Sequence, residues 1–269
     1  IAPAYSGLGE DDESGWDEYR TEYERTHKDL WEDFNAWVQE QGAPALPRLE
    51  FIHSGVHNIY VYPQELDYTG SRPLDANWTR VDSAVRETES AVELPEHFLD
   101  GTKPLVYFSL GSLGGADVEL MQRTVDILGT ADKYNFIVSK GPLADEIILA
   151  ENMWGAEFLP QTRIIPLVDL VITHGGNNTT TESLHFGKPM ILLPLFWDQY
   201  DNAQRVHESG YGRRLDTYEC TPEELLGSIG ELLDDPELQA RCRAAGERIR
   251  PADGLSAAAT ALENVAAAH

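Results

Sequence analysis

The sequence predicts an α/β protein in which a doubly wound parallel sheet is preceded by a partial N-terminal domain. Two observations lead to this fold class. From residue 103 onward, unbroken apolar stretches of strand length alternate with segments of helical periodicity, as in a parallel sheet covered by helices on both faces. Before residue 103 the apolar stretches are short and interrupted by prolines, which is typical of the end of a domain followed by a linker.

An amphipathic helix is predicted near the start of the chain, within the acidic and aromatic residues 10–41. The residues of its apolar face, spaced i, i+3, i+6 and i+7, are Trp31, Phe34, Trp37 and Val38. Gly42 and Pro44 end this helix. Residues 58–62 form the best strand of the stretch that follows.

The remaining elements form a strand–helix series. Strands are predicted at residues 104–110, 134–139, 168–173, 189–194 and 213–215. Helices are predicted at residues 118–128, 178–187, 199–209 and 222–234, followed by two alanine-rich helices at 236–250 and 255–268. We therefore expect three parts: the N-terminal remnant and linker (1–100), the domain of the parallel sheet (101–250) and a C-terminal helix (251–269).

Charge and composition exclude several classes of function. With 46 acidic and 20 basic residues the formal net charge is −26, so we expect no face that binds nucleic acid or anionic lipid through phosphate contacts. No apolar run approaches the length of a membrane span, and no signal segment is recognisable at the start. The chain begins at Ile1, which we interpret as a start within a longer protein. Cys220 and Cys242 have neither metal-ligand spacing nor a disulfide pattern, which favours a reducing, cytoplasmic location.

The first candidate loop, residues 110–115, follows a predicted strand, the place where ligands bind in doubly wound sheets. Its glycines allow close approach to an anion, and the hydroxyl of Ser112 can donate to it. A glycine-rich turn of this kind also occurs for reasons of geometry alone. The loop by itself leaves both interpretations open.

The second candidate loop, residues 173–182, also lies between a strand and a helix. Gly176 exposes backbone N–H groups, Asn178 and Thr179 supply neutral donors and caps, and His174 adds an imidazole where a diphosphate would lie. The loop lacks the lysine of a Walker-type motif. A simple N-cap with a solvated histidine is the alternative, but it leaves the concentration of donors unexplained.

The third candidate loop, residues 194–199, contains Asp198 and Gln199 beside two aromatic residues. A carboxylate next to a carboxamide can accept from and donate to neighbouring hydroxyls, which suits a sugar. An isolated Asp-Gln pair is usually an N-cap. Its position one strand after the histidine loop favours the ligand-binding interpretation.

Together these segments resemble the signature of the UDP-glycosyltransferases, and most closely the bacterial macrolide-type branch. The matching positions run from Phe158-Leu159-Pro160-Gln161 through residues 173–183 and Gly187-Lys188-Pro189 to Pro194, Asp198-Gln199 and Asn202. The match covers about 45 residues in order and spacing, with weaker similarity over residues 58–250. The resemblance implies a two-domain GT-B fold, of which the parallel sheet is the Rossmann-like C-terminal domain.

The resemblance also implies a role for each matching residue. Phe158 would stack on the base, Gln161 would contact base or ribose, and Glu182 would accept from the ribose hydroxyls. The diphosphate would be bound by His174, Gly176, Asn178, Thr179 and the Ser112 loop, and the transferred sugar by Asp198 and Gln199. Asn177 departs from the plant pattern, which has tryptophan at this position, so the sugar preference is not determined.

The implied reaction is inverting transfer of a hexose, from UDP-glucose or another UDP- or TDP-sugar, to a hydroxyl of a small acceptor such as a polyketide, sterol, terpenoid or flavonoid. The resemblance also implies that no metal or other cofactor is needed, and the sequence has no Asp-rich metal motif. The family's general base, a histidine near the start of the acceptor domain, has no counterpart here. His27, His53 and His57 are interpreted as structural or solvent-facing.

Two alternatives remain open at this point. The chain could be a donor-binding module that requires a separate acceptor-binding partner. A UDP-sugar epimerase of similar fold is less consistent with Asp198-Gln199.

Overall fold

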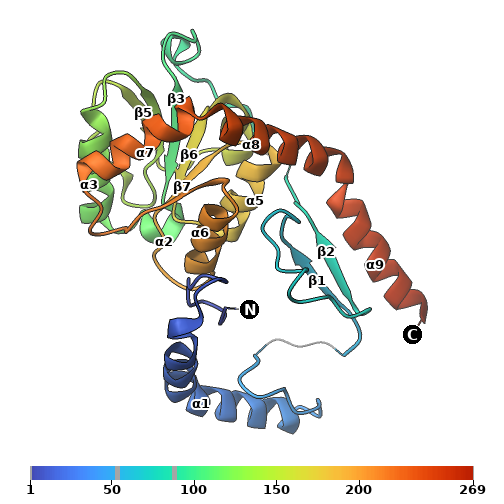
Figure 1. The fold of residues 1–269 in the computed structure, drawn as a ribbon. Helices are drawn as coiled ribbons and strands as arrows, with labels where there is room; N and C mark the ends of the chain where they lie inside the picture. Colours follow the sequence, from blue (N-terminus) through green and yellow to red (C-terminus); the bar gives the residue numbers. More distant parts are fainter. Residues whose placement is uncertain (1, 52–54, 87–89, 269) are drawn as a thin grey trace.

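The computed structural model describes residues 2–51, 55–86 and 90–268, and His53 lies outside them. The described residues form two parallel sheets with helices around the larger one (Figure 1). The larger sheet consists of β3 (Leu105–Ser109), β4 (Asn135–Ser139), β5 (Met153–Ala156), β6 (Leu170–Thr173), β7 (Met190–Leu192) and β8 (Gly212–Arg214). The smaller sheet consists of β1 (Asn58–Val61) and β2 (Trp78–Val81).

The larger sheet is doubly wound, as the sequence predicted. Its strand order is β5-β4-β3-β6-β7-β8, and every pairing is parallel. The chain runs from β3 outward to one edge and then returns to β6, so the topological switch point lies between β3 and β6. In register, Ser109 at the end of β3 pairs with Thr173 at the end of β6, which pairs with Leu192 at the end of β7. Three consecutive strand ends therefore open onto the crevice where such sheets bind ligands.

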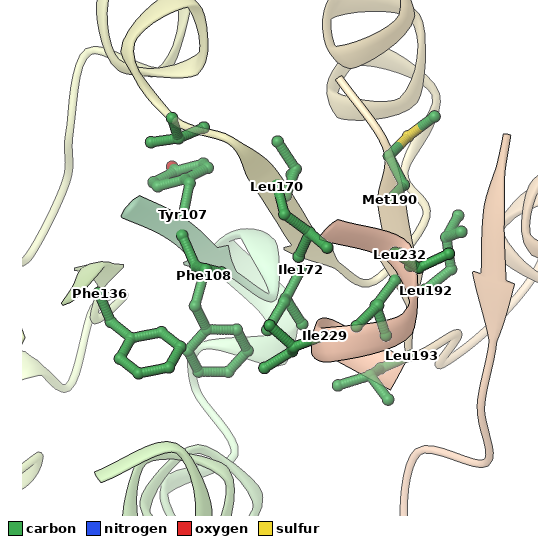
Figure 2. Packing of buried hydrophobic residues seen from close by; sticks show 14 of the residues in the cluster. Tyr107, Phe108, Phe136, Leu170, Ile172, Met190, Leu192, Leu193, Ile229 and Leu232 are labelled. Atoms are coloured by element: carbon green, nitrogen blue, oxygen red, sulfur yellow. The ribbon is translucent and has the colours of Figure 1, made fainter. Parts of the chain in front are cut away.

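Continuous apolar strands explain why this sheet forms. Tyr107 and Phe108 of β3 are both buried and point to opposite faces of the sheet (Figure 2). On one face, Ile229 and Leu232 of the helix α7 (Pro222–Asp234) pack against the central strands. Each such side chain contributes about 1.5–3 kcal/mol when it is fully removed from water. A sheet that is buried on both faces needs strands in which successive residues are apolar.

The structure contains the predicted helices of the strand–helix series and two helices of four residues, at 111–114 and 161–164, that were not predicted. They are α2 (Gly111–Gly114), α3 (Val118–Gly129), α4 (Gln161–Ile164), α5 (Asn177–His185), α6 (Asp198–Glu208), α7 and α8 (Pro236–Ile249). Short 3-10 helices are η1 (Glu13–Gly15), η2 (Glu96–Phe98), η3 (Ala144–Glu146), η4 (Ile165–Leu167) and η5 (Arg250–Ala252). Local capping fixes several starts: Thr221 and Glu224 form a capping box at α7, and Asp235 caps α8.

The sequence analysis missed the edge strand β5. Its sequence, Met-Trp-Gly-Ala, is short and contains a glycine, which usually weakens a strand. Gly155 is needed here because a Cβ at this position would overlap the carbonyl oxygen of Val138 on β4. The close approach of two backbones therefore explains a glycine that, in the sequence, argues against a strand.

The first 100 residues contain the predicted helix, α1 (Trp16–Glu40), which stands away from the sheets (Figure 1). Trp37, on its predicted apolar face, is 54% exposed, whereas Phe34 of that face packs near Phe51. Before α1, the segment 2–10 lies along α6: the backbone N–H groups of Tyr5 and Gly7 donate to the carboxylate of Asp201.

The small sheet is attached to the large domain. The guanidinium of Arg248 on α8 makes a bidentate contact with Glu65 and a further bond of 2.8 Å to Asp82. The C-terminal helix α9 (Gly254–Ala268) packs against β2 (Figure 1). Cys220 and Cys242 are buried free thiols. In the described part of the chain, no helix is long and apolar enough to cross a membrane.

Candidate functional site

The imidazole of His174 lies between the two glycine loops at the switch point. A Cβ at Gly111 would lie 2.8 Å from its Cε1, and a Cβ at Gly176 would lie 2.5 Å from its Nε2. Gly111 also has a φ of +69°, a conformation that favours glycine. These glycines make room for the ring, and Thr173 Oγ1 lies 3.3 Å from its Nδ1. The first and second candidate loops therefore form one site.

Burial controls the charge of this histidine. It lowers the pKa of His174 to about 4, against a smaller opposing effect of a hydrogen bond with the backbone of Ser109. The ring is therefore neutral at pH 7, and its single N–H is the donor of that bond to the Ser109 backbone. Beside it, α5 begins at Asn177 with Gly176 as N-cap, and the N–H groups of Asn178 and Thr179 in its first turn have no partner within the helix. The start of α5 can bind an anion through its backbone N–H groups, and a proton taken up by the adjacent ring would add a second N–H donor.

A second cluster joins Gln161 to Glu182, the residues predicted to contact the nucleoside. Gln161 Nε2 donates a short hydrogen bond to Glu182 Oε2. Gln161 Oε1 accepts from Thr179 Oγ1 at 3.2 Å and from the hydroxyl of Tyr107 at 3.5 Å. Glu182 is only 5% exposed, and a buried carboxylate needs such donors. The cluster therefore fixes a carboxylate beside the N-terminal turn of α5.

The third loop lies next to α5. Asp198 is half-buried, and burial raises its pKa while hydrogen bonds from Asn202 and from the backbone of Asn177 partly oppose that shift. Asn202 Nδ2 also donates to the carbonyl of Gly175 at 2.8 Å, linking α6 to the histidine loop. Gln199 is buried, and its Oε1 accepts from the backbone N–H groups of Leu195 and Phe196. The oxygen of Gln199 thus holds the loop, and its amide N–H groups are the part suited to a ligand.

Three predicted site residues are exposed. Phe158, with 61% of its surface exposed, follows β5, while Ser112 lies in α2 and Asn178 in the first turn of α5. Large apolar side chains are usually buried, so the exposed ring of Phe158 is available for stacking.

The sequence analysis missed a structural role for Asn177. Its Nδ2 donates to the carbonyl of Val61 at 3.1 Å, so it ties the start of α5 to the end of β1. The departure from tryptophan at this position, noted in the sequence, is the only signal that pointed to it. Tyr107 donates a hydrogen bond to Gln161, but nothing in the sequence distinguishes it from an ordinary core residue of a buried strand.

The described contacts of His27 and His57 lie outside this cluster. His27 stacks on Tyr23 with ring centroids 3.9 Å apart, and His57 Nε2 lies 3.0 Å from Thr79 Oγ1. A search of the described ranges finds no group of three or more His, Cys, Asp or Glu side chains arranged to hold a metal ion.

Comparison with known proteins identifies the family. Residues 58–242 match the family model described as "UDP-glucoronosyl and UDP-glucosyl transferase". The chain belongs to this family. The match includes both sheets and all three candidate loops, so the resemblance seen in the sequence is confirmed.

Individual relatives agree with this assignment. The chain is 28% identical over 249 residues to a sterol 3-beta-glucosyltransferase of Pichia angusta, covering 86% of this chain and 19% of the relative. It is 27% identical over 235 residues to the oleandomycin glycosyltransferase of Streptomyces antibioticus, covering 86% of this chain and 54% of the relative. The chain thus spans about half or less of these two proteins.

A solved structure shares the fold. The crystal structure of the glycotransferase of kitacinnamycin matches with a TM-score of 0.79 at 22% identity, covering 94% of this chain and 67% of that one. The GT-B prediction for the fold is confirmed.

Proposed function

We propose that this chain binds a nucleotide-diphosphate sugar and supplies the donor site for transfer of a hexose to a hydroxyl of a small-molecule acceptor. The observation that carries this proposal is the convergence of three strand ends at the switch point. There, the first turn of α5 provides hydrogen-bond donors beside the imidazole of His174, and two half-buried or buried carboxylates flank them. Donors suit a diphosphate and carboxylates suit hydroxyls.

The ligand would lie across the ends of the strands, with its base near β5 and its sugar near β7. Phe158 would stack on the base, and Gln161 and Glu182 would contact the nucleoside, since these two side chains are already joined. The diphosphate would lie over His174 and the start of α5, with Ser112, Gly176, Asn178 and Thr179 around it. Asp198 and Gln199 would hold the sugar at the far side.

The proposed reaction is a single displacement. The acceptor oxygen forms a bond to the anomeric carbon as the bond from that carbon to the diphosphate oxygen breaks, and a general base takes the acceptor's proton. His174 and the amides of α5 stabilise the negative charge that develops on the departing diphosphate. The resemblance attributes the base to a part of the acceptor domain that this sequence does not match, so no described residue is assigned to it.

Ligand binding and turnover test the proposal separately. The unfolding temperature should be measured with UDP, TDP, UDP-glucose and TDP-glucose, because a ligand that binds the folded state raises its stability. The dissociation constant of each ligand should be measured by calorimetry. Binding in the micromolar range is expected for at least one of the four. Absence of binding by all four would refute the donor site.

Product formation would then be followed with polyketide, sterol, terpenoid and flavonoid acceptors. Glycosylated product supports a transferase. Donor binding without product for any acceptor would support the donor-binding module instead.

A further inference from the structure

Trp197, in the third loop, has a backbone conformation that tryptophan rarely adopts. Its φ is +52° and its ψ is −131°. In this region the Cβ of an L-residue crowds its own backbone, and glycine is strongly favoured. The conformation opposes folding, so it persists only where the surrounding structure imposes it.

Hydrogen bonds hold the loop on both sides of Trp197. Gln199 Oε1 accepts from Leu195 N at 2.9 Å and from Phe196 N at 3.2 Å. Tyr200 donates its hydroxyl to the carbonyl of Leu195 at 3.1 Å and its backbone N–H to the carbonyl of Trp197 at 3.2 Å. The backbone around Trp197 is therefore held in place by the loop.

The indole contributes little to the fold. It is 68% exposed, and its ring lies edge-to-face with that of Phe196, with centroids 5.4 Å apart. A large aromatic side chain stabilises a protein mainly by being buried. Neither backbone preference nor packing explains a tryptophan at this position, and residues that violate local rules in this way often serve a ligand.

Asp198, directly after Trp197, shows which ligand fits. Its carboxylate is half-buried and lies near the backbone N–H of Asn177 and the side chain of Asn202. A hexose presents hydroxyls around its rim and C–H groups on its faces, so a carboxylate beside an exposed aromatic ring matches both kinds of surface.

We propose that the indole of Trp197 is a platform on which the hexose ring of the donor stacks, while Asp198 accepts its hydroxyls; this inference rests on the proposed function. The strained backbone keeps the indole out of the core and facing the ligand. Trp197 then contributes to the affinity for the sugar and not to that for the nucleotide.

The test compares Trp197→Phe, Trp197→Ala and Trp197→Gly in calorimetric titrations with UDP and UDP-glucose, and with the TDP pair in parallel. The measured quantity is the ratio of the dissociation constants of nucleotide and nucleotide sugar. We expect this ratio to fall roughly five- to tenfold in the Ala and Gly variants, to change little in the Phe variant, and UDP affinity to stay within about twofold in all three.

Phe158→Ala is the matched control, because Phe158 is a similarly exposed aromatic that follows another strand of the same sheet, β5. Loss of a base-stacking ring should weaken nucleotide and nucleotide sugar equally, leaving their ratio unchanged.

Unfolding temperatures test the strained backbone. At an ordinary position alanine is more stabilising than glycine, but at a positive φ the order reverses. Trp197→Gly should therefore unfold about 2–4 °C above Trp197→Ala. The reverse order would show that the conformation is not strained in solution and would refute that part of the inference.

The outcomes separate the two proposals. If none of the four ligands binds the unsubstituted chain, the proposed function fails and the platform fails with it. If the nucleotide binds but the sugar adds nothing to its affinity, or if the Ala and Gly variants keep the parental ratio, the platform is refuted and the donor site stands.

Discussion

Replacing His174 by glutamine should remove a large part of the acid sensitivity of the fold. Glutamine keeps a donor and an acceptor but does not titrate. In the folded protein burial lowers the pKa of His174 to about 4, compared with 6.5 for an unperturbed histidine. The unfolded chain therefore binds a proton below pH 6.5 that the folded protein takes up only near pH 4. Stability due to this group is fully present above pH 6.5 and is lost as the pH falls toward 4.

The two pKa values set the magnitude. Their full separation corresponds to about 3.4 kcal/mol, at about 1.36 kcal/mol for each pH unit. The ring keeps some contact with solvent, so we expect about 2 kcal/mol. Urea unfolding between pH 7 and 4.5 should show the parent losing about 2 kcal/mol more than His174→Gln. His207→Gln, which removes an exposed histidine from α6, is the control for the loss of one histidine.

The same histidine should couple UDP binding to protons. A diphosphate beside the ring favours its charged form and raises its pKa, so binding near pH 5.5 should take up a proton and become tighter as the pH falls. Calorimetry in buffers with different heats of ionisation measures that uptake. An unchanged UDP affinity in His174→Gln, together with the parental pH dependence of stability, would refute the reasoning for this residue.

Three further substitutions test other parts of the structure. Asp198→Asn should leave UDP affinity within about twofold but remove the additional affinity due to the sugar, by roughly 1–3 kcal/mol; equal losses for UDP and UDP-glucose in calorimetry would contradict its role. Glu182→Gln should abolish discrimination between UDP and TDP. A carboxylate can accept from both vicinal hydroxyls of ribose but from only one of deoxyribose, so we expect the parent to prefer UDP about tenfold, and equal affinities in the parent would exclude this contact. Gly155→Ala should lower the free energy of unfolding by at least about 2 kcal/mol, because its Cβ would overlap the carbonyl of Val138; an unchanged urea midpoint would contradict this reading of β5.

Sequence patterns predicted the central part of the fold well. β3, β4, β6 and β7 are continuous apolar runs, because both faces of the sheet are covered, and such runs between helices have few other interpretations. β5 lacked this signal, since Gly155 is required by a contact with β4 that is distant in sequence. The pairing of β1 with β2 was also not predicted. Both strands are short, and α9, which packs against β2, lies more than 150 residues away in the sequence.

The candidate site could be predicted only in part. The position of the three loops followed from strand ends in a doubly wound sheet, and the identity of the residues followed from the family resemblance. Neither the strand pattern nor the family resemblance showed that Gln161 and Glu182 contact each other, or that the side-chain oxygen of Gln199 accepts hydrogen bonds from its own loop. These are side-chain hydrogen bonds between elements, and they depend on the tertiary arrangement of α4, α5 and α6.

The charge of the protein and the chemistry of the site support one explanation of how a diphosphate would be bound. With a formal charge of −26, the chain as a whole repels anions, and the segments 110–115, 158–161, 173–182 and 194–199 contain no lysine or arginine. Recognition in these loops must therefore use neutral donors. Backbone amides at the start of α5 are held in place by the fold and do not require burial of a cation, which would itself cost desolvation. A site of this kind stabilises charge as it develops on the leaving diphosphate, because its dipoles are already oriented before the reaction begins.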